Sequence, residues 1–193
     1  MLRSGDAQQA WAFDLGADFT AKDVPLTPKL GAEWIFWSGK NVGGGAAGWD
    51  PLARGYYTTA LREFQTGSAT TGFYPNGQTY YVNGVYKSGT AAATNQHQLA
   101  LYGSVKPMED VTIAPRLSWF VLDKAAIPMA GASQVGGIKR RYAGMEWDTQ
   151  VTYNYTDDVQ FGVIYGLFAP GSIYRTPNDN VSQELISSMS VKF

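Results

Sequence analysis

The chain has 193 residues, with 15 Lys and Arg against 16 Asp and Glu, so its charge offers no electrostatic case for binding nucleic acid. It has no cysteine, which excludes disulfides and thiolate metal sites. Charged residues make up only 16%, below the roughly 25% of soluble domains, and no run approaches the ~20 apolar residues of a membrane helix. Few charges with many Gly and aromatic residues are typical of a transmembrane β-barrel, in which every second residue faces lipid.

Seven segments alternate between apolar and polar residues with a period of two, which predicts strands with two different faces. In chain order they cover residues 11–19, about 29–38, 98–106, 111–121, 144–155, 159–167 and 184–193. In the clearest segment, Met145, Trp147 and Val151 form one row and polar residues form the other. Each segment is long enough to cross a bilayer at the usual tilt. We therefore expect residues 1–193 to be a single all-β unit, an antiparallel transmembrane β-barrel segment of about seven strands.

The connections between these segments alternate strictly between short and long. The short ones are 21–28, 107–110 and 156–158, and the long ones are about 40–94, 123–140 and 171–181. Membrane barrels have short periplasmic turns and long extracellular loops, and their last strand ends in the periplasm. All three long connections are therefore expected outside the cell. A loop as long as 40–94 either caps the mouth or folds inward to constrict the pore, and the sequence does not choose between these.

Aromatic residues cluster near both ends of the predicted strands. At the outer end lie Trp11, Phe13, Trp34, Phe36, Trp119 and Phe168, and at the inner end Phe19, Tyr153, Tyr155, Phe161 and Phe193. We interpret them as the two interfacial girdles of a membrane barrel. The alternative is the general preference of aromatic residues for strands.

The C-terminal region resembles a known family. The run Gly144-Met145-Glu146-Trp147-Asp148, continuing as TQVTYNYTDDVQFGVIYGLFAPGSIY and ending in SVKF, is similar to the C-terminal end of alginate-export-family porins. GAEWIFWSGKN and GWDPLARGYYTTALREF resemble a strand and the large loop of that family. The resemblance implies an outer-membrane barrel of about eighteen strands, of which seven would be the C-terminal portion. Phe193, with Val191 and Met189 on the same face, also matches the signal that the barrel-assembly machinery recognises in outer-membrane proteins.

The start of the chain, Met1-Leu2-Arg3-Ser4-Gly5-Asp6, has no signal-peptide pattern, as expected of a fragment or a mature form if the protein is exported. The resemblance implies passive passage of hydrophilic solutes or an anionic polysaccharide across the bacterial outer membrane, with outer-membrane lipid as the surroundings. Two other functions stay open. One is a plugged barrel that acts as a scaffold or binds a partner, and the other is a soluble β-barrel carrier.

Charged residues on the predicted inward rows are candidates for lining the lumen: Lys106, Arg116, Glu146, Asp148 and Lys192. Glu146 and Asp148 could also form an acid–base pair, but a polar lumen wall is the simpler interpretation. The basic cluster Lys139, Arg140 and Arg141 could attract anions at the mouth, or it could be a solvated loop end. Because the inward rows carry both signs, the family name does not by itself identify the substrate.

Enzymatic chemistry is not expected. His97 is the single histidine, so a Ser-His pair or a histidine-rich metal site is hard to build, and we interpret it as a residue of the rim. No cofactor and no metal are expected.

Overall fold

The computed structural model describes residues 11–39, 59–61, 96–126, 129–130, 133–134, 139–175 and 179–193. Its secondary structure consists of β-strands joined by turns and longer connections. Within these ranges there is no helix of the length and hydropathy needed to span a membrane. The longest predicted connection, about 40–94, lies outside the described residues except for Thr59, Ala60 and Leu61.

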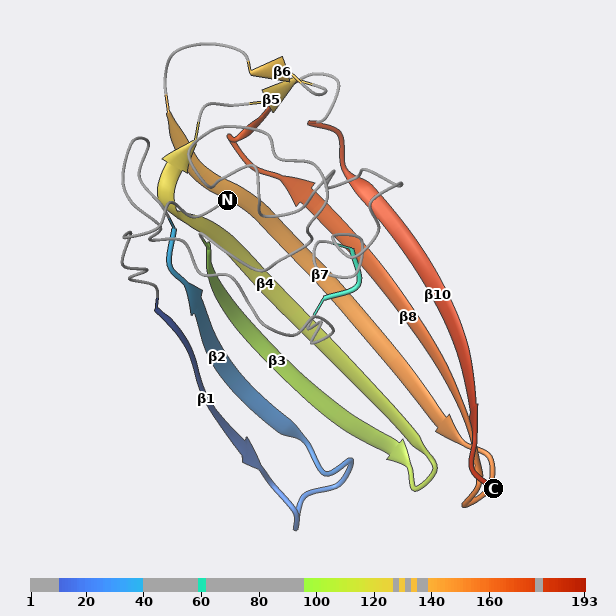
Figure 1. The fold of residues 1–193 in the computed structure, drawn as a ribbon. Coiled ribbons are helices and arrows are strands. Elements are labelled where there is room, and N and C mark those ends of the chain that lie inside the picture. The colour runs from blue at the N-terminus through green and yellow to red at the C-terminus, as the bar shows by residue number, and fades with distance from the viewer. Residues whose placement is uncertain are drawn as a thin grey trace.

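The main sheet is a seven-stranded antiparallel meander in the order β1-β2-β3-β4-β7-β8-β10 (Figure 1). Its strands are β1 (Ala12–Thr20), β2 (Lys29–Trp37), β3 (Gln96–Met108), β4 (Val111–Ala126), β7 (Arg140–Asn154), β8 (Val159–Pro170) and β10 (Ser182–Val191). Each corresponds to one predicted segment, since alternation over about nine residues is a strong strand signal. The ends differ: β4 reaches into the predicted connection 123–140, and the last strand stops at Val191 instead of Phe193.

A second, three-stranded sheet was not predicted. It consists of β5 (Met129–Ala130), β6 (Ser133–Gln134) and β9 (Tyr174–Arg175) in the order β6-β5-β9, with β5 and β9 parallel. Two-residue strands are too short to carry a period, so sequence alternation cannot reveal them. This sheet joins the connection between β4 and β7 to the one between β8 and β10.

The two ends of the main sheet differ in their connections. The turns between β1 and β2, β3 and β4, and β7 and β8 lie together with the C-terminus at one end, at the bottom of Figure 1. Strands β2, β4 and β8 end, and β3, β7 and β10 begin, at the opposite end, where the small sheet lies. Separation of short and long connections is the arrangement of a membrane barrel. We refer to these ends as the turn end and the loop end.

The pairing register keeps the two rows of every strand on opposite sides of the sheet. One continuous row across the strands is Leu15, Trp34, Leu99, Trp119, Met145 and Ala169. The neighbouring row, on the other side, is Gly16, Glu33, Ala100, Ser118, Glu146, Phe168 and Ser182. We call the side of the first row the apolar face and the side of the second the polar face. Since the side-chain period is two, a slip of one residue would exchange them.

The polar face is not polar throughout. At the loop end it carries a cluster of buried apolar side chains from β4, β7, β8 and two connections: Leu61, Phe120, Leu122, Ala143, Phe168, Ile173 and Tyr174. Phe168 is fully buried here, so its assignment to the outer aromatic girdle was wrong. Phe168 lies opposite Glu146 on β7 and Ser182 on β10. Along β8 it points to the same side as Gly162 and Gly166, which is the polar face.

Gly144 allows β7 to change direction beside this cluster. The register between β4 and β7 shifts between Phe120 and Val121, and Gly144 has a φ of 132°. A Cβ atom on Gly144 would lie 2.5 Å from the carbonyl oxygen of Ala169. The position therefore requires glycine both for its backbone conformation and for the close approach of β8.

We expect Gly144→Ala to destabilise the fold by about 2 kcal/mol or more, because the new side chain meets backbone atoms at a φ that alanine rarely adopts. The midpoint of urea unfolding in detergent, followed by circular dichroism, measures the effect. Gly16→Ala is the matched control, since a Cβ there would be 3.5 Å from the nearest atom. Equal midpoints for the two variants would contradict this account of Gly144.

Candidate functional site

Charged residues of the polar face form ion pairs across neighbouring strands. Arg116 on β4 pairs with Glu33 on β2, bridging over the intervening strand β3. Lys29 Nζ lies 3.1 Å from Asp18 Oδ1 on β1. These pairs join residues from β1, β2 and β4, which only the meander brings together. The positive charges of Arg116 and Lys29 on the polar face are therefore each paired with a carboxylate.

Tyr102 separates these two ion pairs. Its backbone lies opposite Gly31, and a Cβ atom on Gly31 would be 2.4 Å from Tyr102 Cζ, so the ring rests on the space that glycine leaves. Lys29 Nζ is 5.6 Å and Arg116 Cζ is 5.5 Å from the ring centroid, within the range of cation–π contacts. An aromatic ring flanked by two cations thus forms part of the polar face.

Glu146 and Asp148, two of the predicted lumen residues, lie on the polar face but are covered. Their exposed fractions are 0% and 6%. The backbone N–H of Leu61 donates to Glu146 Oε1 at 2.5 Å, and that of Ala60 donates to Asp148 Oδ1 at 3.2 Å. A short segment of the longest connection is therefore bound directly to the wall of the sheet.

Toward the turn end the polar face is open and hydrophilic. Gln150 and Asn154 on β7 are exposed, as is Gln160 on β8. Gln150 Nε2 donates to Thr152 Oγ1 at 3.3 Å, and Gln160 Nε2 donates to Asn154 Oδ1 at 2.7 Å. Amides and hydroxyls with spare hydrogen-bonding capacity suit contact with water or with a hydroxyl-rich solute.

The other two predicted lumen residues lie at the turn end. Lys106 follows the last regular pairing of β3, and its N–H donates to the carbonyl of Leu26 in the first turn. Lys192 follows β10, and its N–H donates to the carbonyl of Asp158. Of the five candidates, the structure thus brings together Arg116, Glu146 and Asp148 and places both lysines near the rim of the turn end.

The basic cluster lies at the loop end, at the start of β7. Lys139 and Arg141 are exposed and Arg140 is half-buried. Arg141 donates to the backbone carbonyl of Asp123 on β4. Asp123 also pairs with Lys124 at 3.1 Å and accepts from the N–H of Gly39 at 2.8 Å, so positive and negative groups mix at this end.

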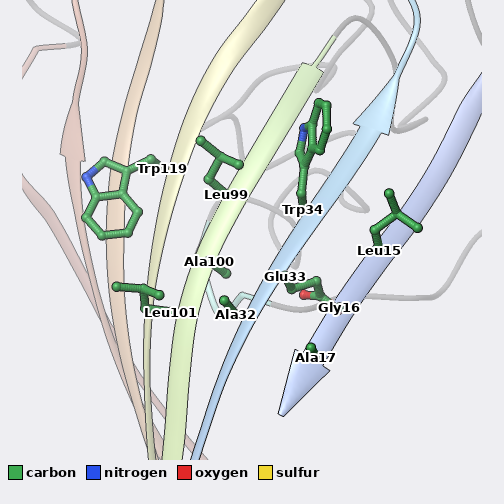
Figure 2. A pocket seen from close by; sticks show the side chains of 10 residues that line it. All are labelled: Leu15, Gly16, Ala17, Ala32, Glu33, Trp34, Leu99, Ala100, Leu101 and Trp119. Atoms are coloured by element: carbon green, nitrogen blue, oxygen red, sulfur yellow. The ribbon is translucent and has the colours of Figure 1, made fainter.

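The apolar face carries large exposed side chains on every strand of the main sheet except β4, whose apolar side chains are half-buried, and near β1, β2 and β3 it is hollowed. The hollow has a volume of about 570 Å³ and is lined by both small and large residues. Figure 2 shows the larger side chains Leu15, Trp34, Leu99, Leu101 and Trp119 spread over four strands, with Ala32 among them and Ala17 below Leu15 on β1. The one charged residue of this lining, Glu33, is paired with Arg116, and the other lining residues are glycine or apolar.

Met189 and Val191 of the predicted assembly signal lie at the C-terminal end of this apolar face, opposite Phe161 and Val159 on β8. Phe193 follows them and is fully exposed. The three residues are thus available on the surface at the turn end.

His97 is placed on the apolar face. Its Nδ1 accepts a hydrogen bond of 3.3 Å from Trp34 Nε1, and its ring lies 4.7 Å from that of Phe36. It therefore takes part in an aromatic cluster on the side away from Glu146 and Asp148. Across the described ranges no three His, Cys, Asp or Glu side chains come close enough together to hold a metal ion.

Sequence reasoning selected Arg116 but not its partner Glu33, nor Lys29, Asp18 and Tyr102. The alternation did place Asp18, Glu33 and Tyr102 on polar rows. Their contacts depend on which residues of β1, β2, β3 and β4 stand side by side, which the period of a single strand does not give.

Comparison with known proteins gives the family. The sequence model of the family described as alginate export matches residues 3–188. No curated protein matches the chain. The match covers most of the chain, including every strand of the main sheet except the last three residues of β10. The chain belongs to the alginate export family, and its seven-stranded sheet is part of a β-barrel of that family.

Proposed function

We propose that the chain forms part of a passive outer-membrane pore for hydrophilic solutes, with the polar face toward the lumen and the apolar face toward lipid. The observation that carries this proposal is the separation of the two faces across all seven strands of the main sheet. A water-soluble sheet needs a second layer to cover such an apolar face, whereas a membrane barrel leaves it to lipid.

The exposure of the apolar face supports contact with lipid. Leu30 and Leu185 are each 70% exposed, and Phe19 is 73% exposed. Leu15, Leu99, Leu101 and Trp147 are also exposed. Exposing so much apolar surface to water would raise the free energy of the folded protein by roughly 25 cal/mol per Å² of apolar area.

The polar face supports passage of hydrophilic solutes and suggests limits on their charge. Arg116 and Lys29 are both held in ion pairs with acids, and Asp14 and Glu184 add negative charge to the same face. Over the described strands, the polar face presents no continuous cationic track for a polyanion. Neutral hydrophilic solutes or a polysaccharide whose hydroxyls bind the amide-lined turn end fit it at least as well as an anionic polymer does.

The remaining parts of the proposal follow from the barrel. The turn end with Met189, Val191 and Phe193 would face the periplasm and be read by the barrel-assembly machinery. The loop end, with Lys139, Arg140 and Arg141, would face outward, and the 40–94 connection would cap or constrict the mouth. The whole barrel would have about eighteen strands, an even number as in other bacterial single-chain barrels. No cofactor is expected to take part.

A plugged barrel that acts as a scaffold is the second candidate, and one observation favours it. The apolar cluster around Phe120 and Phe168 covers the polar face at the loop end together with Leu61. Conductance in a planar lipid bilayer separates the two functions, because a plugged scaffold would be silent.

The assignment of the faces can be tested with neighbouring residues of β7 in this cysteine-free chain. Gln150 lies on the polar face and Val151 on the apolar face, and both are exposed. In lipid, Gln150→Cys should react with a charged methanethiosulfonate and lower the conductance, whereas Val151→Cys should stay unreactive. Equal reactivity of the two variants would contradict a lipid-facing apolar side and would favour a soluble carrier.

A charge on the apolar face should also prevent stable insertion. We expect Leu101→Arg to destabilise the folded barrel in lipid by about 2–4 kcal/mol, the cost of arginine near the middle of a bilayer. Gln150→Arg, on the polar face, is the control and should cost less than about 1 kcal/mol. Folding yield into phosphatidylcholine vesicles at increasing urea measures both. A similar loss for both variants would count against the assignment.

A further inference from the structure

Two consecutive backbone N–H groups of the 40–94 connection point at two carboxylates of the same strand. Ala60 donates to Asp148 and Leu61 donates to Glu146, in antiparallel order along β7. Glu146 and Asp148 are separated by one residue, so both side chains project from the polar face. Hydrogen bonds to a charged acceptor are about twice as strong as neutral ones. The segment Thr59–Leu61 is thus fixed at two points to one strand.

The neighbouring strand is shaped to receive this segment. A Cβ atom on Gly166 would lie 3.0 Å from Ala60 Cβ, 3.0 Å from Asp148 Oδ1 and 3.3 Å from Leu61 Cδ1. A Cβ atom at position 166 would require its neighbours to shift by a few tenths of an ångström, and a bulky side chain there would displace the segment. Gly166 therefore provides the space in which Ala60 and Leu61 lie.

Apolar packing holds the same segment from its other side. Leu61 is 3% exposed and belongs to the buried cluster with Phe120, Leu122 and Phe168. Thr59 and Ala60 are buried as well, at 5% and 6%. Hydrogen bonds, the space at Gly166 and the packing of Leu61 are independent features, and all three place the segment against the polar face.

We infer that Glu146 and Asp148 form a carboxylate latch that holds Thr59–Leu61 against the inner wall, so that this segment sets the width of the pore. The inference rests on the proposed function, because it takes the polar face as the lumen side. Of the two possibilities for the long connection, capping the mouth or folding inward, the inference selects inward folding at Thr59–Leu61. It also gives the two carboxylates a role other than selecting solutes by charge, since the bound segment covers them.

The latch can open without a large electrostatic cost. With the segment released, Glu146 and Asp148 would exchange two backbone donors for water in the lumen, so each carboxylate has a hydrogen-bond donor in both states. Removing their charge should favour the released state. Replacing Leu61 by an acid should do the same from the loop side, through repulsion by Glu146 and loss of apolar packing.

Reactivity of a thiol at position 60 measures the latch directly. In Ala60→Cys the thiol should react slowly with a water-soluble maleimide, because position 60 is buried. Adding Glu146→Gln with Asp148→Asn should speed the reaction at least about tenfold, since two charge-assisted hydrogen bonds are weakened. Asp14→Asn, a polar-face carboxylate on β1, is the matched control and should leave the rate unchanged. Leu61→Asp leaves the wall intact and should act like the double variant.

A cysteine pair tests the position of the segment. Ala60→Cys with Gly166→Cys should form a disulfide under mild oxidation, whereas Ala60→Cys with Gly16→Cys, which lies on β1 at the far edge of the sheet, should not. In a planar bilayer the oxidised first pair should keep the parental conductance even with Leu61→Asp, which raises the conductance when the pair is reduced.

The outcomes separate this inference from the proposed function. Maleimide rates that do not respond to either latch variant, or a failure of the Ala60–Gly166 pair to cross-link, would overturn the latch even if the protein conducts. Latch-dependent rates in a protein that is silent in every variant would overturn the pore, and with it the role of the segment in setting its width.

Discussion

The structure depends on keeping one pairing register across seven antiparallel strands. Each strand alternates between two kinds of side chain, but only aligned pairing turns seven alternating rows into two continuous faces. The rows run without interruption from Leu15 to Ala169 on one face and from Gly16 to Ser182 on the other. In a bilayer this register has a second task, because backbone groups that pair with a neighbouring strand need no water.

Most of the fold could be predicted from the sequence because the side-chain period of a strand is local information. Alternation located all seven main strands, and the contrast between short and long connections gave the two ends. Strand ends were less certain: β4 continues to Ala126, where the apolar and polar rows lose their contrast. Phe168 was misplaced because its size suggested an interfacial aromatic, although its row contained glycines. The small sheet of β5, β6 and β9 left no pattern at all.

The candidate site was predicted only in part, because its chemistry depends on distant segments. Arg116 was recognisable as an inward charge, but its pairing with Glu33 joins residues 83 positions apart. The contacts of Glu146 and Asp148 span 85 and 88 positions and use backbone donors of Ala60 and Leu61, whose side chains show no polar signal. A carboxylate that accepts a backbone N–H looks the same in a sequence as one that faces water. Family membership gives the barrel, whereas the mixed charges of this wall are a property of the chain itself.

The parallel pairing of β5 with β9 has a consequence for how the mouth can be altered. It ties two connections into one unit, although they leave the main sheet at different strands. A peptide inserted between β4 and β7 would therefore also disturb the connection between β8 and β10. An antibody raised against the assembled surface would recognise both connections as one epitope. The hairpin turn around Thr156 is by contrast tied only to its own strands and, through Asp158, to Lys192, so an epitope grafted there would disturb at most the last residues of the chain.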